Sequence, residues 1–364
     1  MKWEREILLN EKAIATEVIW LRQRFVACAQ ADESRAWRDL ALEIFRFQAQ
    51  VNPVYRRYVE LMEVDAMQVR RIEDIPFLPV ELFQTQRVSV FPSPNSDVHC
   101  FESSGTTGSL VSKHSIDDLE WYDQVTASGF ERLMSPWSQK VCFFGLLPGY
   151  LERKTSSLVH MVQSFMKRAG QSEREEWFFL NDFDALEERL QGIHDAGYSS
   201  DEPIYIVGVT HALLKWSGQV QLRAIRPAWL DLPLHIIETG GMKGHGKERI
   251  RAELHEQLET LTSGRSVGGE YGMTELLSQA WSKGGGVFHS PPWMRVLIGA
   301  LNDPRGWADA GRQGRIHVMD LANVSTCSFL ATSDIGRNFA DGSFEVLGRF
   351  DHAEVRGCNL MTMD

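Results

Sequence analysis

The sequence predicts an α/β protein in which largely parallel sheets are layered with helices. Apolar, β-branched runs recur along the chain, and amphipathic helical stretches separate them. Strands that alternate with helices favour a parallel sheet covered on both faces. The expected strands are 141–147, 204–209, 234–237 and 315–319, and the expected helices lie at about 117–134, 155–169, 183–195 and 246–261.

The two ends of the chain carry different patterns. Residues 11–62 show helical periodicity. One apolar face holds Ile14, Val18, Leu21 and Phe25, and another holds Leu40, Ile44 and Phe45. Prolines within 75–79 indicate an extended segment, and 342–355 reads as a hairpin or short strand. We therefore expect a helical segment (1–75) packed on a main domain (76–350), followed by a short hinge and tail (351–364).

Composition and charge exclude several classes of protein. The formal net charge of −11 offers no general basic field for nucleic acid or an anionic membrane. No apolar run approaches the roughly 20 residues of a membrane helix, and the N-terminus lacks a signal-peptide core. The five cysteines are widely spaced and form neither a CxxC pair nor a disulfide framework, so a reducing cytoplasm fits best.

The first motif that indicates chemistry is Ser103–Gly108, with the sequence SSGTTG. Glycine lets the backbone approach a ligand closely, and amide and hydroxyl donors can converge on phosphate oxygens. The motif is not a Walker A loop, because no Gly-Lys-Ser/Thr closes it. A polar surface loop is the alternative for this string taken alone.

A second motif, GEYGMTE, spans Gly269–Glu275. Tyr271 offers a flat face on which a base could stack, Thr274 offers a hydroxyl for a phosphate, and Glu275 offers a hard oxygen for Mg²⁺. Taken alone, a turn plugged by an aromatic ring explains the motif at least as well.

A third cluster joins Thr332–Gly336 to Gly348–Asp351. Asp334 could accept hydrogen bonds from both ribose hydroxyls. Arg349 could stabilise negative charge on the α-phosphate or bind the ribose. Turns that contain aspartate and glycine are common, so each of these features is weak by itself.

The order and spacing of the three motifs resemble the superfamily of acyl-CoA synthetases, peptide-synthetase adenylation domains and luciferases. The resemblance covers roughly residues 100–358 and implies ATP and Mg²⁺ as cofactors. It implies a phosphate loop containing Ser104, Gly105, Thr106, Thr107 and Gly108. It also implies that the adenine is bound by Tyr271 and Gly272 together with Gly240 and Gly241. In the same resemblance Thr274 contacts the α-phosphate and Glu275 binds Mg²⁺. Asp334 holds the ribose, and Arg349 lies beside it.

Two departures from the superfamily pattern are visible. Lys113 is displaced from the usual position of the loop lysine and no proline precedes it. Only residues 352–364 follow the Gly-Arg-x-Asp hinge, so the C-terminal lid domain, whose lysine supports adenylate formation, is expected to be absent. Another cation would then assist adenylation, and the sequence leaves that role open among Lys113, Lys243, His245 and Lys247.

The tail narrows the resemblance to the acyl-protein synthetases (LuxE-type, luciferin-component ligases) of bacterial light-emission operons. The match includes residues 75–83, 103–108, 269–279 and 348–361. In that family the cysteine that matches Cys358 accepts the acyl group from the acyl-adenylate and forms a thioester. A thiolate suits this reaction, and Arg356 could lower its pKa. A packed, inert cysteine is the alternative, and we interpret the other four cysteines as core residues.

The resemblance implies an ATP-dependent ligase. It would convert a fatty acid, long-chain by analogy, to acyl-AMP and pass the acyl group through Cys358 to a partner such as an acyl reductase. A stand-alone CoA ligase like phenylacetate-CoA ligase and a non-catalytic nucleotide-binding relative remain alternatives. Tyr150 and His211 follow expected strands and are candidates for lining an acyl pocket, although a lone tyrosine or histidine at a strand end more often has a structural role. Self-association and the length of the acyl chain stay open.

Overall fold

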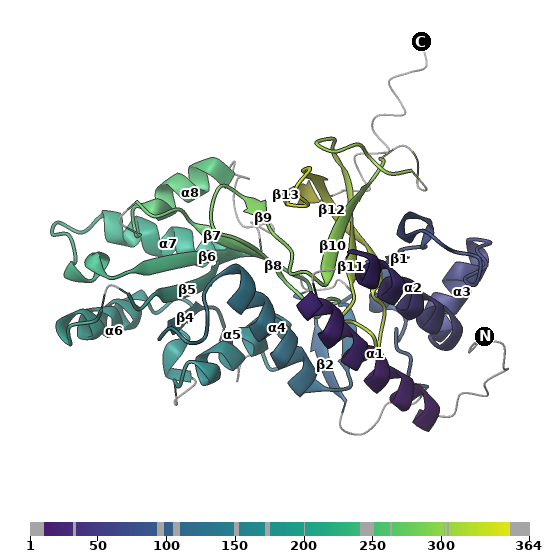
Figure 1. Cartoon of the computed structure of the whole chain (residues 1–364). Helices are drawn as coiled ribbons and strands as arrows, with labels where there is room; N and C mark the ends of the chain where they lie inside the picture. Colours follow the sequence, from purple (N-terminus) through teal and green to yellow (C-terminus); the bar gives the residue numbers. More distant parts are fainter. Residues whose placement is uncertain are drawn as a thin grey trace, which may run out of the picture.

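The fold is built around two sheets, with helices between and around them (Figure 1). The computed structural model describes residues 11–31, 34–92, 98–104, 110–148, 153–171, 175–199, 201–240, 251–262, 264–301, 303 and 306–349. Among these residues no helix combines the length and the apolar character that crossing a membrane requires.

The first sheet has five strands in the order β4-β5-β6-β7-β8. Their bounds are β4 (Cys142–Leu146), β5 (Ile204–Val209), β6 (Leu234–Thr239), β7 (Gly268–Tyr271) and β8 (Ala280–Ser282). The pairs from β4 to β7 are parallel, and β8 is antiparallel to β7. Strand β4 is buried along its whole length, which explains its continuous apolar sequence.

Helices cover both faces of this sheet, as the alternation of strands and helices predicted. On one face Phe144 and Ile206 pack in a cluster with side chains of α6 (Phe183–Asp195), α7 (Thr210–Gln221) and α8 (Arg251–Glu259). On the other face Phe143 lies 5.4 Å from Phe130 of α4 (Leu119–Leu133) and 5.6 Å from Phe165 of α5 (Ser157–Arg168), measured between ring centroids. Short 3₁₀ helices, η3 (Glu175–Trp177) and η4 (Ala228–Asp231), complete this half.

The second sheet has six strands and is mostly antiparallel. Its main order is β10 (Met294–Gly299), β11 (Gly314–Asp320), β12 (Phe329–Asn338), β13 (Phe344–Arg349) and β9 (Val287–Phe288). Strand β1 (Leu78–Pro79), the extended segment expected from the prolines, joins β12 in parallel. The expectation of parallel sheets therefore holds for the first sheet only. In the second, consecutive strands are joined by short connections such as the turn at 339–343, which require antiparallel pairing.

The N-terminal helices pack on the second sheet and on α4. They are α1 (Glu11–Ala31), α2 (Ser34–Val51) and α3 (Pro53–Leu61), and η1 (Ile72–Asp74) and η2 (Val80–Gln84) follow them. Phe25 contacts Trp121 and Trp293, with centroids 5.2 and 5.4 Å apart. Helix α3 begins where the side chain of Asn52 accepts hydrogen bonds from two backbone amides, directly before a proline. Both predicted apolar faces of these helices are buried.

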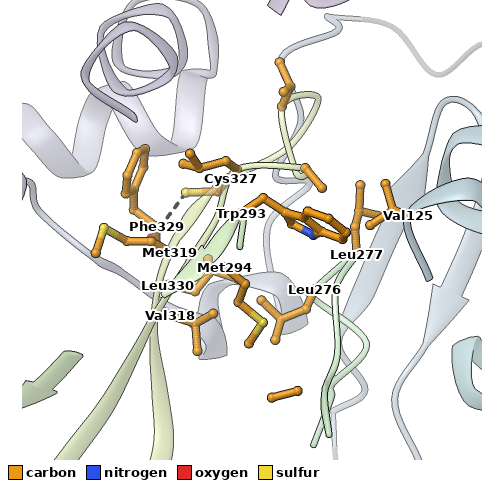
Figure 2. Packing of buried hydrophobic residues seen from close by; sticks show 14 of the residues in the cluster. Val125, Leu276, Leu277, Trp293, Met294, Val318, Met319, Cys327, Phe329 and Leu330 are labelled. Carbon is orange, nitrogen blue, oxygen red and sulfur yellow. Dashed lines mark hydrogen bonds between the residues drawn. The ribbon is translucent and has the colours of Figure 1, made fainter. Parts of the chain in front are cut away.

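The core continues between the two sheets. Figure 2 shows Trp293 and Leu277 beside Val125 of α4, while Phe329 and Cys327 lie toward the N-terminal helices. The three-part division of the chain stays a prediction, and its third part, 351–364, lies outside the described residues.

Candidate active site

The Ser103–Gly108 motif begins directly after the first strand of a hairpin. Strands β2 (His99–Glu102) and β3 (Lys113–Ile116) pair in antiparallel register. Ser103 and Ser112 close the connecting loop, because the Ser103 amide donates to the Ser112 carbonyl (3.0 Å) and the Ser112 amide donates to the Ser103 hydroxyl (2.9 Å). Ser104 is described, whereas 105–109, which include Gly105, Thr106, Thr107 and Gly108, lie outside the described residues.

Tyr271, Asp334 and Arg349 meet although 63 and 15 residues separate them in sequence. The Tyr271 hydroxyl donates to Asp334 Oδ2 (2.9 Å), and Arg349 Nε donates to Asp334 Oδ1 (3.2 Å). Asp334 and Arg349 are register partners across β12 and β13, while Tyr271 ends β7 of the other sheet. The two sheets therefore converge at these three predicted residues.

The Tyr271 ring is buried against the second sheet. Its centroid lies 5.4 Å from that of Phe344 and 6.0 Å from that of Phe288. Burial, followed by the negative charge of Asp334, raises the pKa of Tyr271 well above its usual value, so the hydroxyl is a permanent donor. Stacking of this ring on adenine stays a prediction.

Thr274 and Glu275 are buried in the turn after β7. Burial raises the pKa of Glu275, while a hydrogen bond from the Ser112 side chain and the positive charge of Arg349 act in the opposite direction. Ser112 at the end of the loop and Arg349 of the third motif therefore both lie close enough to Glu275 of the second motif to act on its pKa. No group of three or more acidic, histidine or cysteine side chains among the described residues forms a metal site. Mg²⁺ often takes only one or two protein carboxylates and completes its shell with phosphates and water, so Glu275 suits that mode of binding.

The carboxyl end of the first sheet carries further polar side chains. Thr239 donates to Glu270 Oε2 (2.5 Å), and Thr210 donates to Glu238 Oε1 (2.6 Å). The Glu270 carboxylate also fills the space beside Gly272, because a Cβ there would lie 2.3 Å from Glu270 Oε1. Any side chain at position 272 would therefore displace Glu270. Glu270 lies inside the second motif, and sequence reasoning did not predict its contact with Thr239.

Other predicted site residues fall at this edge or outside the described chain. Gly240, directly after β6, has a φ of +83°, a left-handed conformation that favours glycine. His211 is exposed on the first turn of α7, directly after β5. The structure does not test its assignment to an acyl pocket. Gly241, Tyr150, Cys358, Lys243, His245 and Lys247 lie outside the described residues.

Lys113 and the described cysteines have surroundings that define their chemistry. The Lys113 ammonium pairs with Glu102 across the β2–β3 hairpin, at 3.3 Å. Burial raises the pKa values of Cys142 and Cys327 to about 12 and raises that of Cys100. These thiols are poor sources of thiolate at neutral pH. The interpretation as core residues holds for Cys142 and Cys327, whereas Cys28 and Cys100 are only partly buried.

The fold resembles those of solved ligases. A 2-hydroxyisobutyryl-CoA ligase in an open conformation with 2-HIB-AMP and CoA has a TM-score of 0.63 at 13% identity, covering 87% of this chain and 70% of the ligase. The same ligase in its postadenylation state with 2-HIB-AMP also scores 0.63, at 14% identity, with 88% and 68% covered. An ATP-bound RpMatB-BxBclM chimera scores 0.50 at 15% identity, with 69% and 47% covered. No curated protein matches the chain.

The fold is therefore that of the adenylate-forming ligases, as the sequence predicted. The family profile described as acyl-protein synthetase, LuxE, matches residues 6–364. The chain belongs to this family. Family and fold together support acyl activation by adenylation, a ligase reaction that uses ATP.

Proposed function

We propose that this chain is an acyl-protein synthetase that activates a long-chain fatty acid and then carries the acyl group on Cys358. A carboxylate oxygen of the acid attacks the α-phosphorus of ATP, the bond to the pyrophosphate oxygen breaks, and acyl-AMP and pyrophosphate form. The observation that carries the proposal is the meeting of Tyr271, Asp334 and Arg349 beside the turn that holds Thr274 and Glu275.

Each of these residues has a role in the proposal. Asp334 is oriented by two hydrogen bonds and is a suitable acceptor for ribose hydroxyls. Thr274 and Arg349 would stabilise charge on the α-phosphate, and the hydroxyl-rich loop would hold the other phosphates. Glu275 would hold Mg²⁺, which neutralises phosphate charge when it is bound. Tyr271, Gly272 and Gly240 would line the adenine site, and Tyr150 and His211 would line the acyl pocket.

The second step would be acyl transfer to a thiolate. Cys358 sulfur attacks the carbonyl carbon of acyl-AMP, the bond to the phosphate oxygen breaks, and AMP leaves with the electron pair. The thioester would then pass to a nucleophile on a partner protein such as an acyl reductase, in a cytoplasmic light-emission pathway or a related one. The high pKa values of Cys100, Cys142 and Cys327 support a nucleophile elsewhere in the chain.

The proposal is tested by incubating the protein with labelled fatty acid, ATP and Mg²⁺ and then treating it with neutral hydroxylamine. We expect label on the wild-type protein that neutral hydroxylamine releases, no label on Cys358→Ser, and undiminished label on the matched control Cys28→Ser. Label found only in acyl-AMP, or in acyl-CoA after coenzyme A is added, would assign the chain to the stand-alone ligases. Absence of ATP–pyrophosphate exchange with every acid in a chain-length series would point to a non-catalytic relative.

A further inference from the structure

The turn that holds Thr274 and Glu275 is fixed from outside by three polar side chains. His114 Nδ1 lies 2.7 Å from the Thr274 carbonyl oxygen, and Asn323 Nδ2 donates to the Glu275 carbonyl (2.9 Å). The Ser112 side chain lies close enough to the Glu275 carboxyl to act on its pKa, in the direction opposite to burial. Ser112 is the last residue of the β2–β3 loop, and His114 is the second residue of β3.

His114 is fully buried in β3. Burial lowers the pKa of His114 to about 4, so the ring is neutral at neutral pH and carries a single N–H. A carbonyl oxygen can only accept a hydrogen bond, so the contact with Thr274 places that proton on Nδ1. The ring therefore donates to the backbone of the residue whose hydroxyl is expected at the α-phosphate.

The other ring nitrogen connects His114 to the turn between β11 and β12. Nε2 lies 2.9 Å from the Thr326 hydroxyl, whose single proton is donated either to this nitrogen or to Asn323 Oδ1. Asn323 donates to two backbone carbonyls, which fixes the orientation of its amide. Asn52 in turn donates to the Thr326 carbonyl (2.8 Å). One nitrogen of His114 thus contacts the candidate catalytic turn, and the other contacts a buried network of hydrogen-bonded side chains.

We propose that His114 is a positioning residue for adenylation, which sets the place of Thr274 relative to strand β3. The inference rests on the proposed function. Residues 114 and 274 are 160 positions apart, so their hydrogen bond is a direct link between the strand that follows the loop and the second motif. Displacing a catalytic group by about 1 Å can lower a rate by up to about 100-fold, so loss of this link is expected to lower kcat.

Two substitutions at position 114 separate the contact of Nδ1 with Thr274 from the contact of Nε2 with Thr326. Asparagine places its amide nitrogen as many bonds from Cβ as Nδ1, whereas glutamine places both its amide oxygen and its amide nitrogen as far out as Nε2. His114→Asn should therefore keep the donor to Thr274, and His114→Gln should keep the contact with Thr326. We expect His114→Gln to lower kcat of ATP–pyrophosphate exchange by about 10- to 100-fold with a smaller change in KM for ATP. We expect His114→Asn to stay within about threefold of wild type.

His317 supplies the matched control. It is another largely buried histidine, and burial lowers its pKa to about 4 as well. Its ring packs against Phe77 and Trp307, with centroids 5.1 and 5.2 Å away, and it touches none of the three motifs in the described contacts. His317→Asn and His317→Gln should lower the unfolding midpoint as the His114 pair does, while leaving kcat within about twofold of wild type.

The outcomes separate failure of this inference from failure of the proposed function. Equal kcat for His114→Asn and His114→Gln, or losses matched by the His317 pair, would show a purely structural role and overturn the inference. If His114→Gln does not fold, folded His114→Asn remains decisive, because a loss of more than about tenfold would contradict the claim that the Thr274 arm suffices. Wild-type protein without any exchange activity would refute the proposed function instead.

Discussion

Acidification tests how deeply the two histidines are buried. His114 and His317 titrate in the folded protein at a pKa of about 4, against 6.5 for an exposed histidine, with burial as the largest cause. Between those values the unfolded chain binds protons that the folded chain does not. Stability is therefore complete above pH 6.5 and is lost as the pH falls toward 4.

The size of the effect follows from the two pKa values. Lowering the pH from neutral to roughly 5 should reduce the free energy of unfolding by about 2 kcal/mol for each histidine, and by about 4 kcal/mol for both. Burial also lowers the pKa values of His99 and His235, so they act in the same direction. The wild-type protein should consequently lose a large part of a typical domain's stability in mild acid.

Urea unfolding followed by tryptophan fluorescence at pH 7, 6 and 5 measures this loss. His114→Asn and His317→Asn should each be less stable than wild type at neutral pH but should lose less stability on acidification, by about 2 kcal/mol. If the two variants and the wild type show parallel dependence on pH, the rings are charged in the folded state and the reasoning is wrong. An equal shift in both variants would also support the use of His317 as a control.

Two further substitutions test contacts around the site. Gln48→Leu should lower the free energy of unfolding, measured in urea, by about 2–5 kcal/mol, because the buried Val324 carbonyl and Ser328 amide in the turn between β11 and β12 lose their partner. The control Gln23→Leu replaces an exposed glutamine and should change the free energy of unfolding by less than about 0.5 kcal/mol. Tyr271→Phe removes the donor to Asp334 and should raise KM for ATP about fivefold, equivalent to about 1 kcal/mol. Tyr198→Phe is the control, because the Tyr198 hydroxyl has no hydrogen-bond partner in the described chain. An equal rise of KM for ATP in both variants would show that the hydrogen bond to Asp334 does not cause the effect.

The sequence predicted three strands of the first sheet, β4, β5 and β6, because they are continuous apolar runs, but it did not predict the short strands β7 and β8. Strand β5 coincides with the predicted 204–209, and β4 lies within the predicted 141–147. The second sheet gave a weaker signal, because burial alternates along its strands. In β10, Met294, Val296 and Ile298 are buried, whereas Arg295 and Leu297, which lie between them, are partly exposed. That period of two is typical of an antiparallel strand with one covered face, but the sequence hides it, because the partly exposed Leu297 is as apolar as its buried neighbours.

Site residues that belong to short sequence motifs could be predicted. Contacts between residues that are far apart in the sequence could not. Tyr271, Asp334 and Arg349 were found from short motifs, and the structure brings them together. The contacts of Ser112 and Asn323 with Glu275 depend on residues that are 163 and 48 positions from it. No local pattern identifies the partner of a buried hydroxyl or amide, because the fold alone decides which backbone groups face it.

His114 illustrates why such a residue carries information only after the fold is known. An aliphatic residue at position 114 would avoid the desolvation that lowers the histidine's pKa, and it would fill a buried position in β3 equally well. It would, however, leave the Thr274 carbonyl without the donor that lies 2.7 Å away. An unpaired buried carbonyl costs about 1–3 kcal/mol, and the turn could recover that energy only by moving toward another donor. The hydrogen bond therefore constrains where Thr274 lies, and this constraint on position is what the paired His114 variants measure.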